Sequence, residues 1–183
     1  LPKGQHVLIY GPPGNGKTTL INLMAGLLKP TKGKILFKDM DYSFMQELEI
    51  DNLRKEKFGF IFQKLHLIEH LNVEQNISLG QNTVNNKELS ELIDILGLSA
   101  KKKSLAKYLS FGESQRVAIA RGLIKKPEVI FADEPTSALD DDNAKKFIEL
   151  ILSETKKNNT SIIISSHDGR IKKYFSNVLM VSR

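Results

Sequence analysis

A glycine-rich loop near the amino terminus constrains this chain more than any other segment. The eight residues Gly-Pro-Pro-Gly-Asn-Gly-Lys-Thr occupy positions 11–18, between an apolar run at 6–10 and a helically spaced apolar run at 19–28. A buried strand, a glycine loop and a helix in this order are the setting in which the pattern G-x-x-x-x-G-K-[ST] binds phosphate. The glycines let backbone N–H groups approach phosphate oxygens, and the helix terminus adds the positive end of its dipole. The segment therefore predicts a nucleoside triphosphate site.

Two side chains of this loop have distinct expected roles. Lys17 is expected to reach the outer phosphates, and the Thr18 hydroxyl is expected to ligate Mg²⁺. The predicted nucleotide-binding residues of the segment are Gly11, Pro12, Pro13, Gly14, Asn15, Gly16, Lys17, Thr18 and Thr19. The loop alone does not decide the function, because a version with two prolines is as similar to the loop of hexameric AAA+ remodelling ATPases as to that of transporter ATPases.

The composition sets broad limits. The 183 residues suffice for one compact domain with a core and a small subdomain, and 40% hydrophobic and 26% charged residues are ordinary globular values. The absence of cysteine excludes a disulfide framework, a thiolate metal site and cysteine catalysis. No apolar run approaches the ~20 residues that span a bilayer. No signal peptide is visible either, so we expect that this chain does not itself cross a membrane.

The net charge of +6 raises the question of a nucleic-acid or membrane-surface partner. The lysines are spread along the chain, with one tight cluster at 101–103. This distribution also suits a nucleotide-binding protein beside anionic lipid, so we expect no direct nucleic-acid binding. The sequence begins with Leu rather than Met, ten residues before the glycine loop, and we expect that its amino terminus is trimmed.

Apolar runs alternate with amphipathic segments, which predicts an α/β fold with a mostly parallel sheet flanked by helices. The predicted strands are Gln5–Tyr10, Lys34–Lys38, Phe58–Phe62, Val129–Ala132, Ser161–Ser165 and Val178–Val181. The predicted helices are Lys17–Leu28, Met45–Lys55, Lys87–Leu96, Glu113–Ile124, Asp142–Thr155 and Gly169–Tyr174. Residues 65–107 show helical patterns without a clear strand. We therefore predict a helical subdomain at 65–107, inserted into a sheet domain made of 1–64 and 108–183.

A pair of carboxylates follows one of the buried strands. The run Val-Ile-Phe-Ala at 129–132 ends in Asp133 and Glu134. In a nucleotide enzyme, a carboxylate at such a strand end is placed to hold Mg²⁺, which is the role expected of Asp133. Glu134 would face the γ-phosphate and polarise the attacking water as general base. An acidic cap ahead of Pro135 is the structural alternative, and the glycine loop favours the functional interpretation.

One segment, at 109–123, limits the possible functions more than any other. Its sequence is Leu-Ser-Phe-Gly-Glu-Ser-Gln-Arg-Val-Ala-Ile-Ala-Arg-Gly-Leu. It closely resembles the signature sequence and following helix of ATP-binding cassette (ABC) ATPases. Ser110 and the backbone N–H of Gly112, at the start of a helix, form an anion site. The resemblance implies that Ser110, Gly112 and Glu113 bind the nucleotide of the opposite subunit, so that two ATP molecules are enclosed in a head-to-tail dimer.

Three further segments are similar to the same family in order and spacing. Phe62-Gln63 resembles the Q-loop, in which Gln63 would contact Mg²⁺ and the attacking water and sense the membrane partner. Residues 137–140, Ser-Ala-Leu-Asp, resemble the D-loop, which places Asp140 at the dimer interface. Residues 165–168, Ser-Ser-His-Asp, resemble the switch loop, in which His167 would donate to the γ-phosphate and orient Glu134.

The resemblance spans essentially the whole chain and implies a P-loop NTPase fold of the ABC type. It implies an ATP hydrolase with ATP and Mg²⁺ as cofactors, Glu134, His167, Gln63 and Lys17 as catalytic residues, and Thr18, Gln63 and Asp133 as metal ligands. It also implies a homodimer or paired cassette and an integral membrane permease as partners, at the cytoplasmic face of the membrane. The segments at 59–63, 72–77, 113–121 and 132–136 are most similar to the lipoprotein-release and macrolide-efflux exporter ATPases.

The sequence departs from the family pattern at three places. Phe111 replaces the first glycine of the signature, where a bulky ring could slow hydrolysis or weaken the nucleotide sandwich. The aromatic residue that stacks on adenine lies upstream of the glycine loop in this family, so no residue of this sequence is assigned to that role. Pro13 removes one backbone N–H from the loop, and we expect little cost from it.

Other functions remain open from the sequence. The same ATP switch could regulate a membrane complex of the cell-division kind without moving cargo, or the cassette could be only weakly active because of Phe111. A DNA-repair or chromosome-organising ATPase shares the glycine loop and signature, but such proteins insert a long coiled coil or a zinc module that this chain lacks. An AAA+ ATPase would not explain the signature-like sequence at 109–116.

Overall fold

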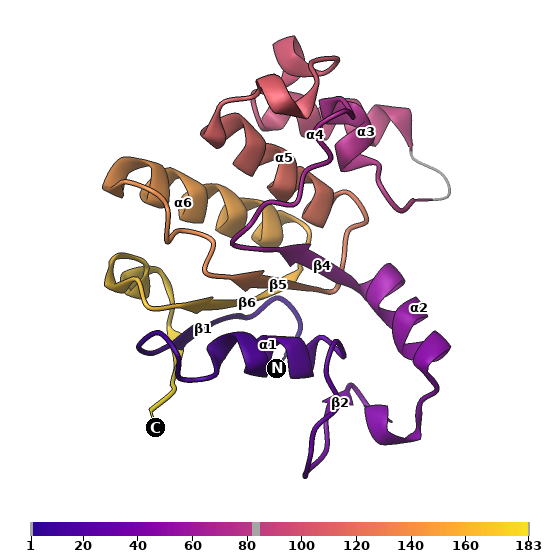
Figure 1. The fold of residues 1–183 in the computed structure, drawn as a ribbon, viewed down its shortest axis with the longest axis vertical. Coiled ribbons are helices and arrows are strands. Elements are labelled where there is room, and N and C mark those ends of the chain that lie inside the picture. Colours follow the sequence, from indigo (N-terminus) through magenta and orange to yellow (C-terminus); the bar gives the residue numbers. More distant parts are fainter. Residues whose placement is uncertain (1, 82–84, 183) are drawn as a thin grey trace.

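A five-stranded, fully parallel sheet forms the centre of the computed structural model, which describes residues 2–81 and 85–182. The strand order is β4-β5-β6-β1-β7 (Figure 1). The strands are β1 His6–Tyr10, β4 Phe58–Ile61, β5 Val129–Asp133, β6 Ser161–Ser166 and β7 Asn177–Met180. Each overlaps a strand predicted from an apolar run, so the α/β class with a parallel sheet is confirmed.

Alternation along the central strands divides the core into two clusters. Successive side chains of a strand point to opposite faces of the sheet. Leu8 accordingly packs with one buried cluster and Ile9 with the other, and Ile162 and Ile163 of β6 divide in the same way. Because both faces are covered, these strands are continuous apolar runs rather than alternating ones.

Helices cover the two faces of the sheet (Figure 1). Helix α1 (Lys17–Met24) lies on one face, and helices α5 (Phe111–Leu123) and α6 (Asp141–Lys157) lie on the other. Helix α2 (Glu47–Lys57) precedes β4 and contributes Ile50 and Leu53 to the cluster on the α1 side. Among residues 2–81 and 85–182, no helix combines the length and apolar character needed to cross a bilayer.

Where the structure describes them, residues 65–107 contain short helices joined by turns and loops, with an isolated β-bridge between Asn72 and Leu105. They hold α3 (Val73–Ile77), α4 (Asn86–Ile95) and two short 3₁₀ turns at Ser99–Lys101 and Ala106–Tyr108. Residues 82–84 lie outside the described part. Ile77 of α3 and Ile93 of α4 are fully buried and share one apolar cluster with the α5 and α6 side of the sheet. The helical character predicted for this region is therefore present, whereas its limits as a subdomain remain a prediction.

Several element boundaries differ from the sequence-based expectation. The strand predicted at 34–38 shrinks to β2 (Leu36–Phe37), which pairs antiparallel with β3 (Met40–Asp41) outside the main sheet, across a turn with Lys38 at φ 55°. A 3₁₀ turn, Tyr42–Phe44, follows. Helix α1 ends before the predicted Leu28 because Gly26 adopts φ 68°. The segment Gly169–Tyr174 is a 3₁₀ helix rather than an α-helix.

Candidate functional site

Three loops meet at the carboxyl edge of the sheet. The strands β5, β6 and β1 are neighbours, and each ends in residues that the sequence singled out. The backbone N–H of Gly11 donates to the carbonyl of Ser166 at 3.3 Å, and that of Glu134 donates to the carbonyl of Ser165 at 2.9 Å. In open α/β sheets, ligands bind beyond the carboxyl ends of the strands, which is where these loops lie.

The glycine loop has the geometry of an anion cradle. Gly14 and Gly16 adopt φ 80° and 82°, a conformation that residues with a side chain rarely adopt. Nothing lies within 4 Å of the place that a Cβ would take at either position, so the glycines are required by their backbone angles and not by crowding. Gly16 begins α1 without a side-chain cap, so the first N–H groups of the helix remain available to a bound anion. At Gly11, a Cβ would come within 2.4 Å of the Val181 carbonyl. Asn15 donates to that carbonyl at 3.2 Å and closes the loop against the end of the chain. These features fit a phosphate group.

Lys17 is buried beneath the loop and is held by three oxygens. Its Nζ donates to the carbonyls of Gly11 at 2.8 Å and Pro12 at 3.0 Å, and it lies 3.2 Å from Oε1 of Glu134. The side chains of Lys17 and Glu134 are 5% and 11% exposed, so the ion pair is largely shielded from water. A buried charge pair of this kind interacts strongly with any further charge brought beside it.

Asp133 and Thr18, the two residues expected to bind a metal ion, contact each other. The Thr18 hydroxyl donates to Oδ1 of Asp133 at 3.1 Å, and Ser165 donates to the same oxygen. Hydroxyl and carboxylate oxygens are the ligands that Mg²⁺ prefers, usually with substrate phosphates completing its shell. Within the described residues there is no group of three or more His, Cys, Asp or Glu that could hold a metal ion.

Glu134 lies at the centre of the site in a strained conformation. Its φ of 47° is in the left-handed region, which costs a non-glycine residue conformational energy. Oε2 lies 2.9 Å from Nδ1 of His167 and accepts from the Ser166 hydroxyl and the His167 N–H, both at 3.3 Å. The carboxylate is thus held between Lys17 on one side and His167 on the other.

Gln63 follows β4 and contacts the loop after Glu134. Its Nε2 donates to the Ser137 hydroxyl at 3.2 Å, and that hydroxyl donates to the Glu134 carbonyl at 3.0 Å. The structure therefore brings Gln63 to the backbone of the proposed base, next to the predicted D-loop.

The signature residues lie apart from the glycine loop, at the start of α5. Ser110 and Glu113 form a capping box, in which the Ser110 hydroxyl accepts from the Glu113 N–H at 3.2 Å and Oε2 of Glu113 accepts from the Ser110 N–H at 2.8 Å. These hydrogen bonds hold the pKa of Glu113 below its usual range. Gly112 is the second residue of α5, and Phe111 before it is 50% exposed. The described contacts of this group therefore leave its outer face free for another molecule.

Asp140 caps the helix that follows the predicted D-loop. Its two carboxylate oxygens accept from the backbone N–H of Asn143 at 2.8 Å and from the Asn143 side chain at 2.7 Å. These hydrogen bonds lower the pKa of Asp140. The carboxylate is exposed at the start of α6, where it remains open to solvent or to a partner.

Two serines and an arginine of the site were not assigned roles from the sequence. Ser165 contacts Asp133, Ser166 contacts Glu134, and Arg170 contacts Asp168. Ser165 ends a predicted apolar strand. A polar residue at that position was the one available sign that its side chain contacts a carboxylate at the end of the neighbouring strand.

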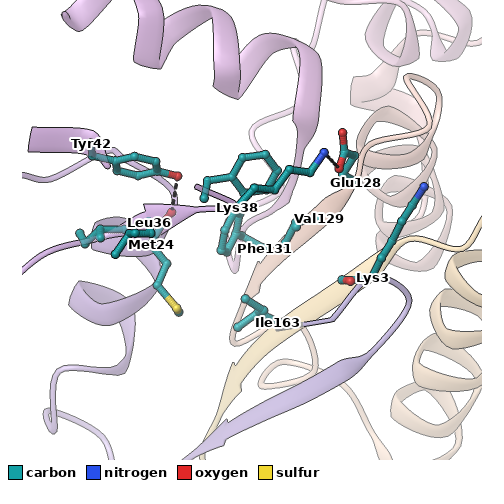
Figure 2. A pocket seen from close by; sticks show the side chains of 12 residues that line it. Lys3, Met24, Leu36, Lys38, Tyr42, Glu128, Val129, Phe131 and Ile163 are labelled. Carbon is teal, nitrogen blue, oxygen red and sulfur yellow. Dashed lines mark hydrogen bonds and ion pairs between the residues drawn. The ribbon is translucent and has the colours of Figure 1, made fainter. Parts of the chain in front are cut away.

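A cavity of about 610 Å³ lies elsewhere, between the sheet and the β2–β3 hairpin (Figure 2). Glu128, Val129 and Ser161 line it, and they mark the amino ends of β5 and β6. Lys38 pairs with Glu128 across it at 2.8 Å, and the Tyr42 hydroxyl donates to the Met24 carbonyl at 3.1 Å. The cavity is therefore at the opposite edge of the sheet from the glycine loop.

Comparison with known proteins identifies the family of this arrangement. The family model described as ABC transporter matches residues 1–137. The lipoprotein-releasing system ATP-binding protein LolD of Buchnera aphidicola is 44% identical over 93% of this chain and 77% of its own length. The putative hemin import ATP-binding protein HrtA of Staphylococcus aureus is 37% identical over 97% of this chain and 82% of its length.

Solved structures agree with these relatives. The dimeric, post-hydrolysis ATP-binding cassette MJ0796, bound to ADP and phosphate, has a TM-score of 0.87 and 28% identity, covering 100% of this chain and 83% of the other. The protein cbiO1 from Clostridium perfringens, part of the transporter complex cbiONQ, has a TM-score of 0.89 and 30% identity, covering 100% and 75%. The chain belongs to the ABC transporter family, as an ATP-binding cassette with the P-loop NTPase fold and ABC-type ATPase activity.

Proposed function

We propose that this cassette hydrolyses Mg²⁺-bound ATP in a head-to-tail dimer and thereby drives an integral membrane permease. The observation that carries the proposal is the position of Glu134, whose carboxylate lies 3.2 Å from Lys17 and 2.9 Å from His167 beside the glycine loop. Phosphoryl transfer to water requires a base, a cation that binds phosphate and a group that can donate a proton, all within reach of one another.

The glycine loop and Lys17 bind and orient the phosphates. Gly14, Asn15 and Gly16 present backbone N–H donors, and Lys17 transfers its hydrogen bonds from the loop carbonyls to the outer phosphates. Thr18, Asp133 and Gln63 would hold Mg²⁺, which neutralises charge on the phosphates when bound. The Ser165 and Thr18 hydroxyls both donate to Oδ1 of Asp133 and so keep this carboxylate oriented toward the proposed Mg²⁺ position.

Glu134 acts as the general base for water attacking the γ-phosphate in line. His167 donates to the γ-phosphate and keeps Glu134 oriented through the hydrogen bond between them. The Ser166 hydroxyl donates to the same carboxylate oxygen of Glu134, Oε2, that lies beside His167. Departure of inorganic phosphate after hydrolysis removes the negative charge that these contacts hold, and the site then opens.

A second subunit supplies the other half of the nucleotide site. Ser110, Gly112 and Glu113 of one subunit cover the γ-phosphate bound to its partner, with Asp140 close to the interface. The exposed start of α5 supports this proposal, and so does the similar cassette MJ0796, which is a dimer bound to ADP and phosphate. A helix terminus of this kind suits an anion.

The membrane partner is proposed from the relatives. LolD is named as part of a lipoprotein-releasing system, and HrtA is named as a putative hemin import protein. We propose that this cassette works in the same way, bound to a permease at the cytoplasmic face of the membrane.

Replacing Glu134 by Gln tests the role of the base. The amide keeps the shape of the side chain but cannot accept the proton, so turnover should fall by about 10²- to 10⁴-fold. The measurement is phosphate release at saturating ATP and Mg²⁺. Glu128→Gln is the matched control, because this carboxylate lies just before the other end of β5 and pairs with Lys38 and Lys57. Turnover of Glu134→Gln within a few-fold of the native rate would exclude this role.

A further inference from the structure

Arg170 ties together two loops that carry the chemistry. Its Nε and Nη2 donate to the two carboxylate oxygens of Asp168, each at 2.8 Å. Nη2 also donates to the Leu139 carbonyl at 3.1 Å, and Nη1 pairs with Oδ1 of Asp141. One guanidinium thus contacts the segment after His167 and the segment that leads into α6.

The acceptor at the centre of this group is buried. The Asp168 side chain is 7% exposed, and its Oδ2 also accepts from the buried Thr136 hydroxyl at 2.9 Å. The Arg170 guanidinium holds the pKa of this carboxyl below its usual range. A buried carboxylate is stable only with such partners, and a forked pair is the strongest form that the partnership takes.

A continuous path of hydrogen bonds leads from this group to Glu134. The backbone N–H of Asp168 donates to the Ser166 hydroxyl at 3.0 Å, and that hydroxyl donates to Oε2 of Glu134 at 3.3 Å. On the other side, Thr136 follows Glu134 by two residues in the chain. The path therefore joins the exposed Asp141, through Arg170 and Asp168, to the base and to His167.

We propose that Arg170 is a positioning residue for ATP hydrolysis, which fixes the 136–141 segment to the His167 loop. Movement of residues 139–141, of which Asp140 and Asp141 are exposed, then changes the orientation of Glu134 and His167 instead of being lost in a flexible loop. The inference rests on the proposed roles of these two residues. Lys does not replace Arg in this role, because one ammonium cannot reach both carboxylates and the Leu139 carbonyl in the fork geometry.

Replacing Arg170 by Met tests the proposal in the intact chain. The base then loses its orientation, and kcat should fall by about 10- to 100-fold, as small misplacements of catalytic groups do, with KM for ATP changed by less than about threefold. Arg170→Lys should not restore kcat. Lys173→Met, which removes the same charge from the same 3₁₀ helix, is the matched control and should keep the native rate.

Hydrogen–deuterium exchange gives a readout that a merely local role would not change. Arg170→Met should raise the exchange of both 136–141 and 165–170. Asp141→Asn, at a side chain that is 87% exposed and tolerant of change, should raise the exchange of 165–170 from the far end of the path. The double variant that carries both Asp141→Asn and Arg170→Met should have the same kcat as Arg170→Met alone, because the two changes break one connection.

The outcomes separate this inference from the function on which it rests. A native kcat in Arg170→Met, full recovery in Arg170→Lys, or an unchanged exchange of 165–170 in Asp141→Asn overturns the positioning role. If Arg170→Met does not fold, the exchange and kcat of Asp141→Asn decide alone. Glu134→Gln is assayed beside them: its turnover tests the proposed function, whatever the Arg170 variants show.

Discussion

At the scale of single residues, the site is defined by which charges it brings together. Lys17 gives its hydrogen bonds to two loop carbonyls and to Glu134, while Glu134 also contacts His167. The carboxylate therefore neutralises the cation that ATP needs and adds a negative charge beside the incoming phosphates. We therefore expect Glu134 to oppose binding of ATP, the substrate whose hydrolysis it is proposed to assist.

Glu134→Gln should accordingly bind ATP more tightly than the native protein. Removing the charge frees Lys17 and relieves repulsion, and we expect the Kd for ATP to fall by about tenfold, equivalent to ~1.4 kcal/mol. The measurement is titration with a fluorescent ATP analogue in the presence of Mg²⁺. Glu128→Gln, on the far edge of the sheet, should bind as the native protein does. Weaker binding by Glu134→Gln would show that the carboxylate does not compete for Lys17.

Phe111 lies where the signature that this segment resembles has its first glycine. The ring is half exposed at the first position of α5, next to the proposed anion donors. Phe111→Gly should raise turnover by about threefold, a change of ~0.6 kcal/mol in the barrier, because the smaller residue lets the partner close more tightly. Steady-state phosphate release measures this effect. Phe111→Leu keeps the bulk and should leave the rate unchanged; a slower Phe111→Gly would show that the ring assists closure.

At the scale of elements, the start of α5 combines a structural and a functional task. The capping box of Ser110 and Glu113 orders the first turn, and the same turn carries the proposed trans site. Lys101 lies 3.7 Å from Glu113 and ties the turn to the helical region before it. The order of this turn and the binding of the partner's nucleotide are therefore linked.

Glu113→Gln should preserve both tasks, because Gln also completes a capping box. We expect turnover within about twofold of native and little change in thermal stability. Ser110→Ala removes the cap and should lower the free energy of unfolding by about 1 kcal/mol, together with a loss of turnover. Thermal melts and phosphate release measure the two effects. A large loss of turnover in Glu113→Gln without destabilisation would assign its charge a direct role at the nucleotide.

The sequence predicted those elements whose pattern is local. Buried strands such as Ser161–Ser166 are continuous apolar runs with a polar end, and the glycine loop defines the start of α1. The hairpin at 36–41 was harder to predict, because a two-residue strand has too few positions to show alternation. The 3₁₀ form of Gly169–Tyr174 was also hard to predict, because a segment of 6 residues has too few positions for its apolar spacing to distinguish a 3₁₀ helix from an α-helix.

The site was predictable only as far as its motifs extend. Lys17, Asp133, Glu134 and His167 are named by motifs, and the sheet order brings them together. The supporting contacts of Ser165 and Arg170 depend on tertiary geometry: Arg170 reaches Leu139 and Asp141 across about 30 positions of the chain. No spacing in the sequence contains that information.

At the scale of the whole molecule, the proposed nucleotide site is incomplete. The glycine loop leads into α1 on one face of the sheet, whereas the proposed anion donors begin α5, which lies on the opposite face (Figure 1). Within the described residues, the side-chain hydrogen bonds and ion pairs of Ser110 and Glu113 are with each other and with Lys101. A second copy, turned head to tail, would place its α5 over the first copy's glycine loop.

The mass of Glu134→Gln in solution tests this composite site most directly. With ATP and Mg²⁺, slow hydrolysis should trap the closed state, so sedimentation or light scattering should give twice the mass of the 20.6 kDa chain. With ADP, or in Glu134→Gln carrying Ser110→Ala, the protein should remain a monomer. A monomer at saturating ATP, in a protein shown to bind the nucleotide, would contradict the account.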